Sequence, residues 1–261
     1  MRCETCDLGI DISFTCPYCK GVFCTIHRLP EAHNCPMLYA VKVRPTHSTV
    51  LIPRLKSSVQ VSTSKVEVAH LLIAWFVLTL CFSMRYVFRA LPTLPLIFII
   101  YLGMVGTGFV FHELMHKFTA QRYGYWSEFR LWPQGLLIAL FSSLVTGGSF
   151  IFAAPGATYV IPHYDSYEWS NILKKRSMGA ISLAGPLSNV AWATIFFALS
   201  GLDGLLGFIG IAGFQVNLWL AAFNMIPLGS LDGKKVLSWN VTVWVVFTIP
   251  LWIIQAFVML V

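Results

Sequence analysis

Charged residues are scarce in this chain of 261 residues, at 11% of the total. Hydrophobic residues make up 57%, well outside the usual range for a soluble globular protein. The first 60 residues contain no long apolar run, so we expect no signal peptide. Beyond residue 35 the only cysteine is Cys81. These absences exclude an ordinary soluble domain and separate a polar N-terminal part from an apolar remainder.

The apolar residues gather in blocks of roughly twenty, which is enough to cross a bilayer core of roughly 30 Å. The blocks cover about 66–90, 95–118, 135–154, 178–200, 204–226 and 240–261. An integral membrane protein is therefore predicted. The formal charge of +7 suggests contact with anionic headgroups of the lipid bilayer. We expect no nucleic-acid binding, because the basic residues are scattered around the membrane segments.

The cysteine-rich N-terminal part carries eight side chains of the kinds that bind zinc. They are Cys3, Cys6, Cys16, Cys19, Cys24, His27, His33 and Cys35. Eight ligands complete two four-coordinate sites with no open position, as in structural zinc sites. The interleaved histidines favour metal binding and a reducing compartment, with disulfides as the alternative. Such a small module cannot fold on its apolar surface alone, so metal binding would supply its folding free energy.

A second metal-binding pattern, His112-Glu113-Leu114-Met115-His116, follows a long apolar run. On a helix, H-E-x-x-H places two histidines on one face as ligands of one zinc, with Glu113 as a base. A catalytic zinc usually has three protein ligands, and Asp232 is the best third candidate. Ionisable groups at membrane depth are costly and by default mark a function. The sequence therefore predicts hydrolytic zinc chemistry within the membrane.

The proposed meeting of the two histidines with Asp232 fixes the number of membrane crossings. Both groups lie near C-terminal ends of apolar segments, so these two segments must run in the same direction. This requires 135–154 to enter and leave on the same side, as an apolar hairpin with strand-like arms. Irregular backbone at this depth is tolerated where protein buries it. We therefore predict five full spans.

The distribution of Lys and Arg gives the orientation. With a re-entrant 135–154 and a cytosolic N-terminus, the outer loops carry only Arg85 and Arg89. The cytosolic flanks and loops carry Arg54, Lys56, Lys65, Lys117, Arg122, Arg130, Lys174, Lys175, Arg176, Lys234 and Lys235. Such an excess of positive charge is typical of the cytosolic side. We expect a cell-membrane protein whose N-terminus is cytosolic and whose zinc site lies near the cytosolic face.

Three motifs together resemble the site-2 proteases, which are zinc metalloproteases that cleave inside membranes. The motifs are His112–His116, Ala184-Gly185-Pro186-Leu187-Ser188-Asn189 and Asn224-x-x-Pro227-x-x-x-Leu231-Asp232-Gly233. They span a core of about 95–235, where the apolar insert at 135–160 is longer than the family's usual hairpin. In this chemistry His112, His116 and Asp232 hold zinc, water takes the fourth position, and Glu113 moves protons. The resemblance makes Asn189 and Asn224 candidates to hydrogen-bond the substrate backbone or the oxyanion.

The N-terminal ligand pattern resembles an AN-one-type zinc finger at all eight ligand positions. The resemblance implies a cross-braced arrangement of two structural zinc ions. One is held by Cys3, Cys6, Cys24 and His27, and the other by Cys16, Cys19, His33 and Cys35. Fingers of this class are cytosolic interaction modules, so a cytosolic protein is the partner that we expect.

The sequence thus predicts a two-zinc finger at 1–37, a linker at 38–65 and a membrane domain at 66–261. The membrane domain is expected to be an all-α bundle with a re-entrant or β hairpin. Its predicted function is an intramembrane zinc metalloendopeptidase acting on transmembrane protein substrates, with one catalytic and two structural zinc ions. The hairpin at 135–160 would present a strand edge to an unwound substrate.

Two other functions are kept as alternatives. The first is a non-catalytic membrane-anchored zinc-finger adaptor. The second is a metal transporter, which would favour a polar path through the bundle. The outer half of the apolar segments offers almost no polar side chains for such a path.

Overall fold

The computed structural model describes residues 2–9, 14–16, 18–37, 63–87, 91–162 and 171–260. The chain divides into two compact units, Met1–Lys56 and Ser57–Val261. Most of the predicted linker, including short strands expected near 39–44 and 49–52, lies outside the described residues.

The N-terminal unit contains one short antiparallel pair, β1 (Phe14–Thr15) and β2 (Val22–Phe23). Phe23 is buried, and its ring stacks on His33 at 3.7 Å between centroids. The other buried members of this small core are Cys3, Cys16 and Cys35. The core of the unit is therefore made largely of candidate metal ligands.

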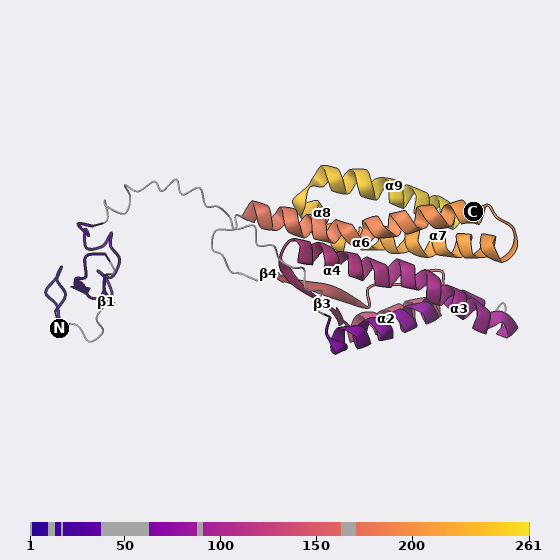
Figure 1. Ribbon diagram of the computed structural model, residues 1–261, viewed down its shortest axis with the longest axis horizontal. Coiled ribbons are helices and arrows are strands. Elements are labelled where there is room, and N and C mark those ends of the chain that lie inside the picture. The colour runs from indigo at the N-terminus through magenta and orange to yellow at the C-terminus, as the bar shows by residue number, and fades with distance from the viewer. Residues whose placement is uncertain are drawn as a thin grey trace. The chain divides into compact units, whose positions relative to one another are not determined.

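The second unit is a bundle of helices (Figure 1), as the sequence predicts. Among the described residues, five helical stretches are long and apolar enough to cross a membrane. They are Lys65–Tyr86, Leu94–Arg122, Lys175–Ser200, Gly204–Asn224 and Val241–Leu260. These five stretches match the five predicted spans, and 135–154, the sixth apolar block, lies outside that set.

The first two stretches are built from several elements. The first holds α2 (Lys65–Ser83) and the 3-10 turn η1 (Met84–Tyr86). After the 3-10 turn η2 (Leu91–Thr93) come α3 (Leu94–Val105), the π-helical turn η3 (Gly106–Val110) and α4 (Phe111–Arg122). Such π turns occur often at functional sites.

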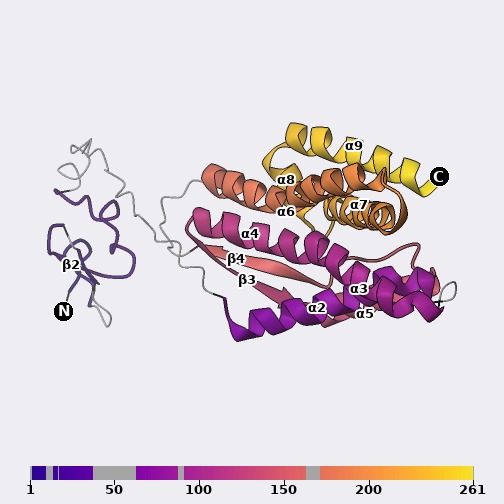
Figure 2. The same ribbon diagram turned by 45° about the vertical axis from the view of Figure 1, so that its right-hand side comes forward.

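The remaining helices follow the hairpin along the chain. They are α6 (Asn171–Ser200), α7 (Gly204–Asn224), the short α8 (Asp232–Trp239) and α9 (Val241–Leu260). Helix α6 lies at the centre of this group and packs against α4, α7 and α8. Figure 2 shows α2, α3 and α5 on one side of α4 and the later helices on the other.

The segment between α4 and α6 is a re-entrant excursion. It consists of β3 (Tyr125–Leu131), α5 (Pro133–Val145) and β4 (Gly156–Pro162). The two strands are antiparallel, with Tyr125 opposite Pro162 and Leu131 opposite Gly156. The chain therefore enters and leaves this segment at the same end, as the ligand argument requires.

The predicted strand-like arms within 135–154 are wrong, because 133–145 is helical and the strands lie on either side of this segment. Pro133 suits the first turn of a helix, and the following Leu and Ala residues are good helix formers. Gly147 and Gly148 end the helix with φ of 60° and 79°. The N–H of Gly148 donates to the carbonyl of Ser143 at 2.7 Å, which closes a C-terminal cap.

A buried ion pair joins α2 to α4. The Lys117 ammonium, only 2% exposed as a residue, donates to the carboxylate of Glu67. The other carboxylate oxygen of Glu67 accepts from the N–H of Phe129 in β3 at 3.1 Å. Lys117 is counted above among the cytosolic flank residues. In the structure it is buried, and its ion pair with Glu67 links α4 to α2 and, through Glu67, to β3.

Candidate active site and zinc centres

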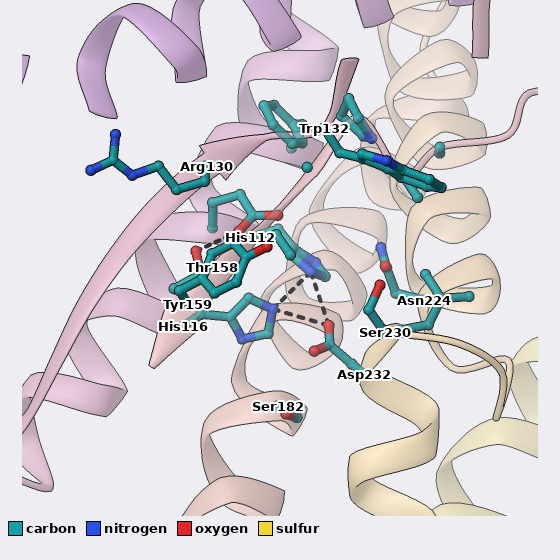
Figure 3. A pocket seen from close by; sticks show the side chains of 18 of the residues that line it. His112, His116, Arg130, Trp132, Thr158, Tyr159, Ser182, Asn224, Ser230 and Asp232 are labelled. Atoms are coloured by element: carbon teal, nitrogen blue, oxygen red, sulfur yellow. Dashed lines mark hydrogen bonds and ion pairs between the residues drawn. The ribbon is translucent and has the colours of Figure 1, made fainter. Parts of the chain in front are cut away.

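Three side chains from distant parts of the sequence meet at one point (Figure 3). The Nε2 atoms of His112 and His116 are 3.0 Å apart. The Oδ2 atom of Asp232 lies 3.3 Å from the first and 3.0 Å from the second. All three residues are buried. Helix α4 supplies both histidines one turn apart, and the start of α8 supplies the aspartate.

Hydrogen bonds behind the histidines fix which nitrogen faces the centre. Nδ1 of His112 lies 2.6 Å from Oδ1 of Asn189, and Nδ1 of His116 lies 2.8 Å from the carbonyl oxygen of Ile181. Both oxygens can only accept, so both Nδ1 atoms carry the proton and donate. Each Nε2 is then left with a lone pair directed at the centre, which is the form that binds metal.

The geometry fits zinc. With zinc–ligand bonds of about 2.0–2.1 Å, a tetrahedral site has ligand atoms about 3.3 Å apart. The observed separations of 3.0–3.3 Å agree. Two lone-pair nitrogens and a carboxylate oxygen at this spacing repel one another unless a cation lies between them. Three protein ligands also leave a fourth position open, as in catalytic zinc sites.

The Asp232 carboxyl is held in its charged form. Lys235, one turn further along α8, places its ammonium 3.8 Å from Oδ1. A charged carboxylate is the form that binds a cation.

Glu113 lies beside this centre, in the position of a base. Its side chain lines the same cavity as both histidines. The hydroxyl of Thr158, in β4, donates to Oε2 of Glu113 at 2.7 Å. The re-entrant segment therefore orients the carboxylate, an arrangement for which the sequence gives no local signal.

Asn189 lies behind His112, away from the space that a substrate would enter. It is fully buried, and its Nδ2 donates to the carbonyl of Gly108 at 2.6 Å and to Oδ1 of Asn217 at 3.2 Å. Its Oδ1 accepts from His112. Both ends of the amide are thus engaged, so Asn189 is a positioning residue. The expected contact with substrate or oxyanion is not supported.

Asn224 lies at the cavity wall, as a substrate contact requires. Its Nδ2 donates to the carbonyl of Leu220 at 3.0 Å, within the last turn of α7. Figure 3 shows its amide on the Asp232 side of the cavity, next to Ser230. Asn224 therefore remains a candidate for a hydrogen bond to substrate.

The cavity around the centre has a volume of about 500 Å³. Its walls come from α4, β3, β4, α6, α7 and the start of α8. Residues 153–160 line it from the re-entrant segment, and Leu220 and Asn224 line it from α7.

Two further residues of the site were not predicted from the sequence. Asn217 is fully buried in α7 and donates to the hydroxyl of Thr107 at 3.3 Å, which extends the chain of polar contacts behind His112. The sequence could have indicated Asn217, because an asparagine inside so apolar a helix usually makes a polar contact with a neighbouring helix. Gly185 is the second, because a Cβ there would lie 2.5 Å and 2.6 Å from the Nε2 atoms of His116 and His112.

The N-terminal unit contains two further groups of candidate ligands, and each group has the predicted four members. The first is Cys3, Cys6, Cys24 and His27, and the second is Cys16, Cys19, His33 and Cys35. Contacts within the groups include 4.0 Å between the Sγ atoms of Cys6 and Cys24. A tetrahedral site with sulfur ligands at about 2.3 Å has edges of about 3.7 Å. All seven cysteines are free, so metal is favoured over the disulfide alternative.

Backbone N–H groups stabilise the thiolate forms of Cys3 and Cys16. Burial raises the pKa of Cys3, but hydrogen bonds from the backbone of Cys24, Thr5 and Cys6 outweigh burial and lower the pKa to about 5. Cys16 has a pKa lowered to about 6 by the backbone of Cys19 and Tyr18, again against burial. Thiolates are the form that binds zinc.

Comparison with known proteins supports both the zinc finger and the zinc metalloprotease that the sequence predicts. Residues 2–40 match the family model of the AN1-like zinc finger. A Methanocaldococcus jannaschii protein, "Putative zinc metalloprotease MJ0611", is 48% identical over 159 residues, which are 60% of this chain and 78% of that protein. A Bacillus subtilis protein, "Putative zinc metalloprotease YwhC", is 28% identical over 168 residues, which are 59% of this chain and 73% of that protein. No solved structure matches.

Proposed function

We propose, because this chain belongs to the zinc metalloprotease family of its M. jannaschii relative, that its membrane unit is an intramembrane endopeptidase of the site-2 type. One observation carries the proposal. Two histidines, an aspartate and a glutamate meet in a cavity that is walled by helices long and apolar enough to cross a membrane. Its substrates would then be the transmembrane segments of other proteins.

Each residue of the site has a separate role in the proposed peptide hydrolysis. A zinc ion held by His112, His116 and Asp232 would polarise the scissile carbonyl and acidify a water to a pKa of about 7. Glu113 takes the proton of the attacking water and returns one to the leaving amine. Thr158 holds Glu113 in place for both transfers. Asn189 and the carbonyl of Ile181 hold the two imidazoles in the correct orientation.

The outer edge of β4 offers a place for an unwound substrate. The N–H of Trp132 donates to the carbonyl of Pro155, which makes the pair 132–155 a hydrogen-bonded one. Pairs alternate in an antiparallel ladder, so Gly156, Thr158 and Val160 direct their backbone groups away from β3. In agreement, Phe129 and Leu131, opposite two of them, donate to α2.

A substrate strand would add to this edge and so satisfy the hydrogen bonds that it loses on unwinding. The strand edge that the sequence analysis assigns to 135–160 is therefore confined to β4, residues 156–162. Because it lines the cavity that holds Glu113, an added strand would pass the catalytic groups.

The location and partners follow from the same proposal. The excess of basic residues at the site end of the bundle favours a cytosolic active site in a cell-membrane protein. The two-zinc finger would then lie in the cytosol and bind a protein partner there. In total the chain would hold one catalytic and two structural zinc ions.

The variant Glu113→Gln tests the proposal. Purified protein in lipid nanodiscs is mixed with a model single-span substrate, and cleavage is followed by gel. Losing the proton carrier should slow cleavage by about 100-fold or more. The zinc content should be unchanged, because Glu113 is not among the three ligands. Glu31→Gln in the finger is the matched control and should cleave like wild type.

Equal cleavage by wild type and Glu113→Gln would refute the proposal. It would favour the adaptor alternative, in which the finger does the work and the membrane unit is an anchor. Loss of zinc in Glu113→Gln would instead assign Glu113 a ligand role and contradict its role as the base.

A further inference from the structure

A second cavity, of about 430 Å³, lies on the opposite side of the bundle from α8 and is polar where the sequence predicts almost no polar side chains. Its walls come from α2, η1, α3, α7, α9 and residues 148–151. Arg85, Tyr101, Ser149, Gln215 and Gln255 contribute the polar groups. Among the described lining residues Arg85 is the only charged one, and its charge is positive.

The two cavities share their walls. Helix α7 lines the outer cavity with Gln215 and Trp219 and the active-site cavity with Leu220 and Asn224. Likewise, Ile151 lines the outer cavity and Ala153 the active-site cavity. Between them, the indole N–H of Trp219 donates to the carbonyl of Ile151 at 3.0 Å, which ties the walls together. The two cavities therefore lie next to each other along α7 and residues 151–153.

The lining groups indicate what they bind. No described acidic side chain forms an ion pair with Arg85, so its guanidinium is available for a carboxylate. The Oε1 atom of Gln255 is buried and has no hydrogen-bond partner among the described residues. This oxygen has almost no accessible surface, so Arg85 is the group that would select a ligand. Because the cavity adjoins the active-site cavity along α7, the substrate is the nearest source of a carboxylate, and a lipid phosphate is the alternative that the experiment distinguishes.

We propose that the outer cavity is an exosite for the substrate, which receives an Asp or Glu side chain on the outward side of the scissile bond. The inference rests on the proposed protease function and deepens it by naming a specificity determinant. Gln215 and Asn224 are nine residues apart on α7, which is roughly 14 Å. The acidic residue would then lie roughly four residues from the scissile bond in an extended substrate, and roughly nine in a helical one.

A position scan with charge exchange tests the exosite. A model transmembrane substrate with an all-leucine outer half is compared with versions that carry one Asp, Asn or Lys three to ten residues outward of the cleavage site. Enzymes are full-length wild type, Arg85→Gln, Arg85→Glu and, as a surface-cation control, Arg122→Gln. Each is assayed in neutral phosphatidylcholine nanodiscs and in nanodiscs containing phosphatidylglycerol.

Wild type and Arg122→Gln should cleave one Asp substrate best, with a KM about tenfold below that of the leucine substrate. Arg85→Gln should lose this preference but cleave the leucine substrate at the wild-type rate, which also shows that it is folded. Arg85→Glu should transfer the preference to Lys at the same position. These results should be the same in both lipids.

Other outcomes would overturn the exosite. One is cleavage by wild type with no dependence on the outer residue. Another is an Arg85→Gln defect that affects every substrate equally and appears only with phosphatidylglycerol, since this identifies a headgroup site. If wild type cleaves no better than Glu113→Gln, the protease function itself fails, which is a separate result.

Discussion

At the scale of single residues, Gly185 leaves no room for a side chain next to the two histidines of the active site. A side chain at this position would occupy the space in front of both imidazoles, with its Cβ 2.5–2.6 Å from their Nε2 atoms. Real Cβ atoms do not approach other atoms so closely, so the histidines or the helix would have to move. The glycine of the Gly185-Pro186 pair thus allows α6 to pass directly beside the metal ligands.

Gly185→Ala should therefore displace the metal ligands. We expect loss of the catalytic zinc and at least about tenfold slower cleavage, as for changes next to metal ligands, while zinc in the finger is retained. Metal analysis and the substrate assay measure both effects. Gly103→Ala is the control, because no atom lies within 4 Å of its added Cβ. Wild-type zinc content and activity in Gly185→Ala would contradict the assigned geometry.

At the scale of elements, the sequence predicts the five long helices because each is a continuous apolar run. It also predicts which segment turns back, since the third ligand and the charge bias both require it. It does not predict that β3 pairs with β4, because the partners are separated by the whole of α5. For the same reason the contact between Thr158 and Glu113 and the placement of Asn189 behind His112 follow only from the fold.

If a substrate strand adds to the edge of β4, proline substitutions at the neighbouring residues Val160 and Ile161 should have different effects. The N–H of Val160 points away from β3, whereas Ile161 belongs to a hydrogen-bonded pair with Trp126. Val160→Pro should therefore keep the fold and the zinc but raise KM by about tenfold, because it removes one donor to an added strand. Ile161→Pro should lower the thermal unfolding temperature, because it removes a bond within the sheet. Thermal unfolding and cleavage kinetics measure these effects, and an unchanged KM in Val160→Pro would rule out strand addition at this position.

At the scale of the whole molecule, the chain combines two kinds of candidate zinc site in two units. The N-terminal groups have four candidate ligands each and no free position, which is typical of sites that stabilise a small unit. The membrane unit has three ligands, a neighbouring carboxylate and a cavity, which are the requirements of catalysis. The comparisons name the same two kinds of protein, since residues 2–40 match the zinc-finger model and relatives named as zinc metalloproteases match about 60% of the chain.

The division into two units predicts that their metal sites are lost independently. Wild type should hold about three zinc ions, and both His116→Ala and Cys24→Ala should hold about two. The double variant should hold about one, because changes in separate compact units are expected to be additive. Cys24→Ala should still cleave the model substrate, since its missing zinc lies in the unit Met1–Lys56. Metal analysis of the four proteins, together with the cleavage assay, tests whether the metal sites of the two units are lost independently. If His116→Ala also empties the finger, or Cys24→Ala abolishes cleavage, the two units depend on each other and the finger takes part in the activity of the membrane unit.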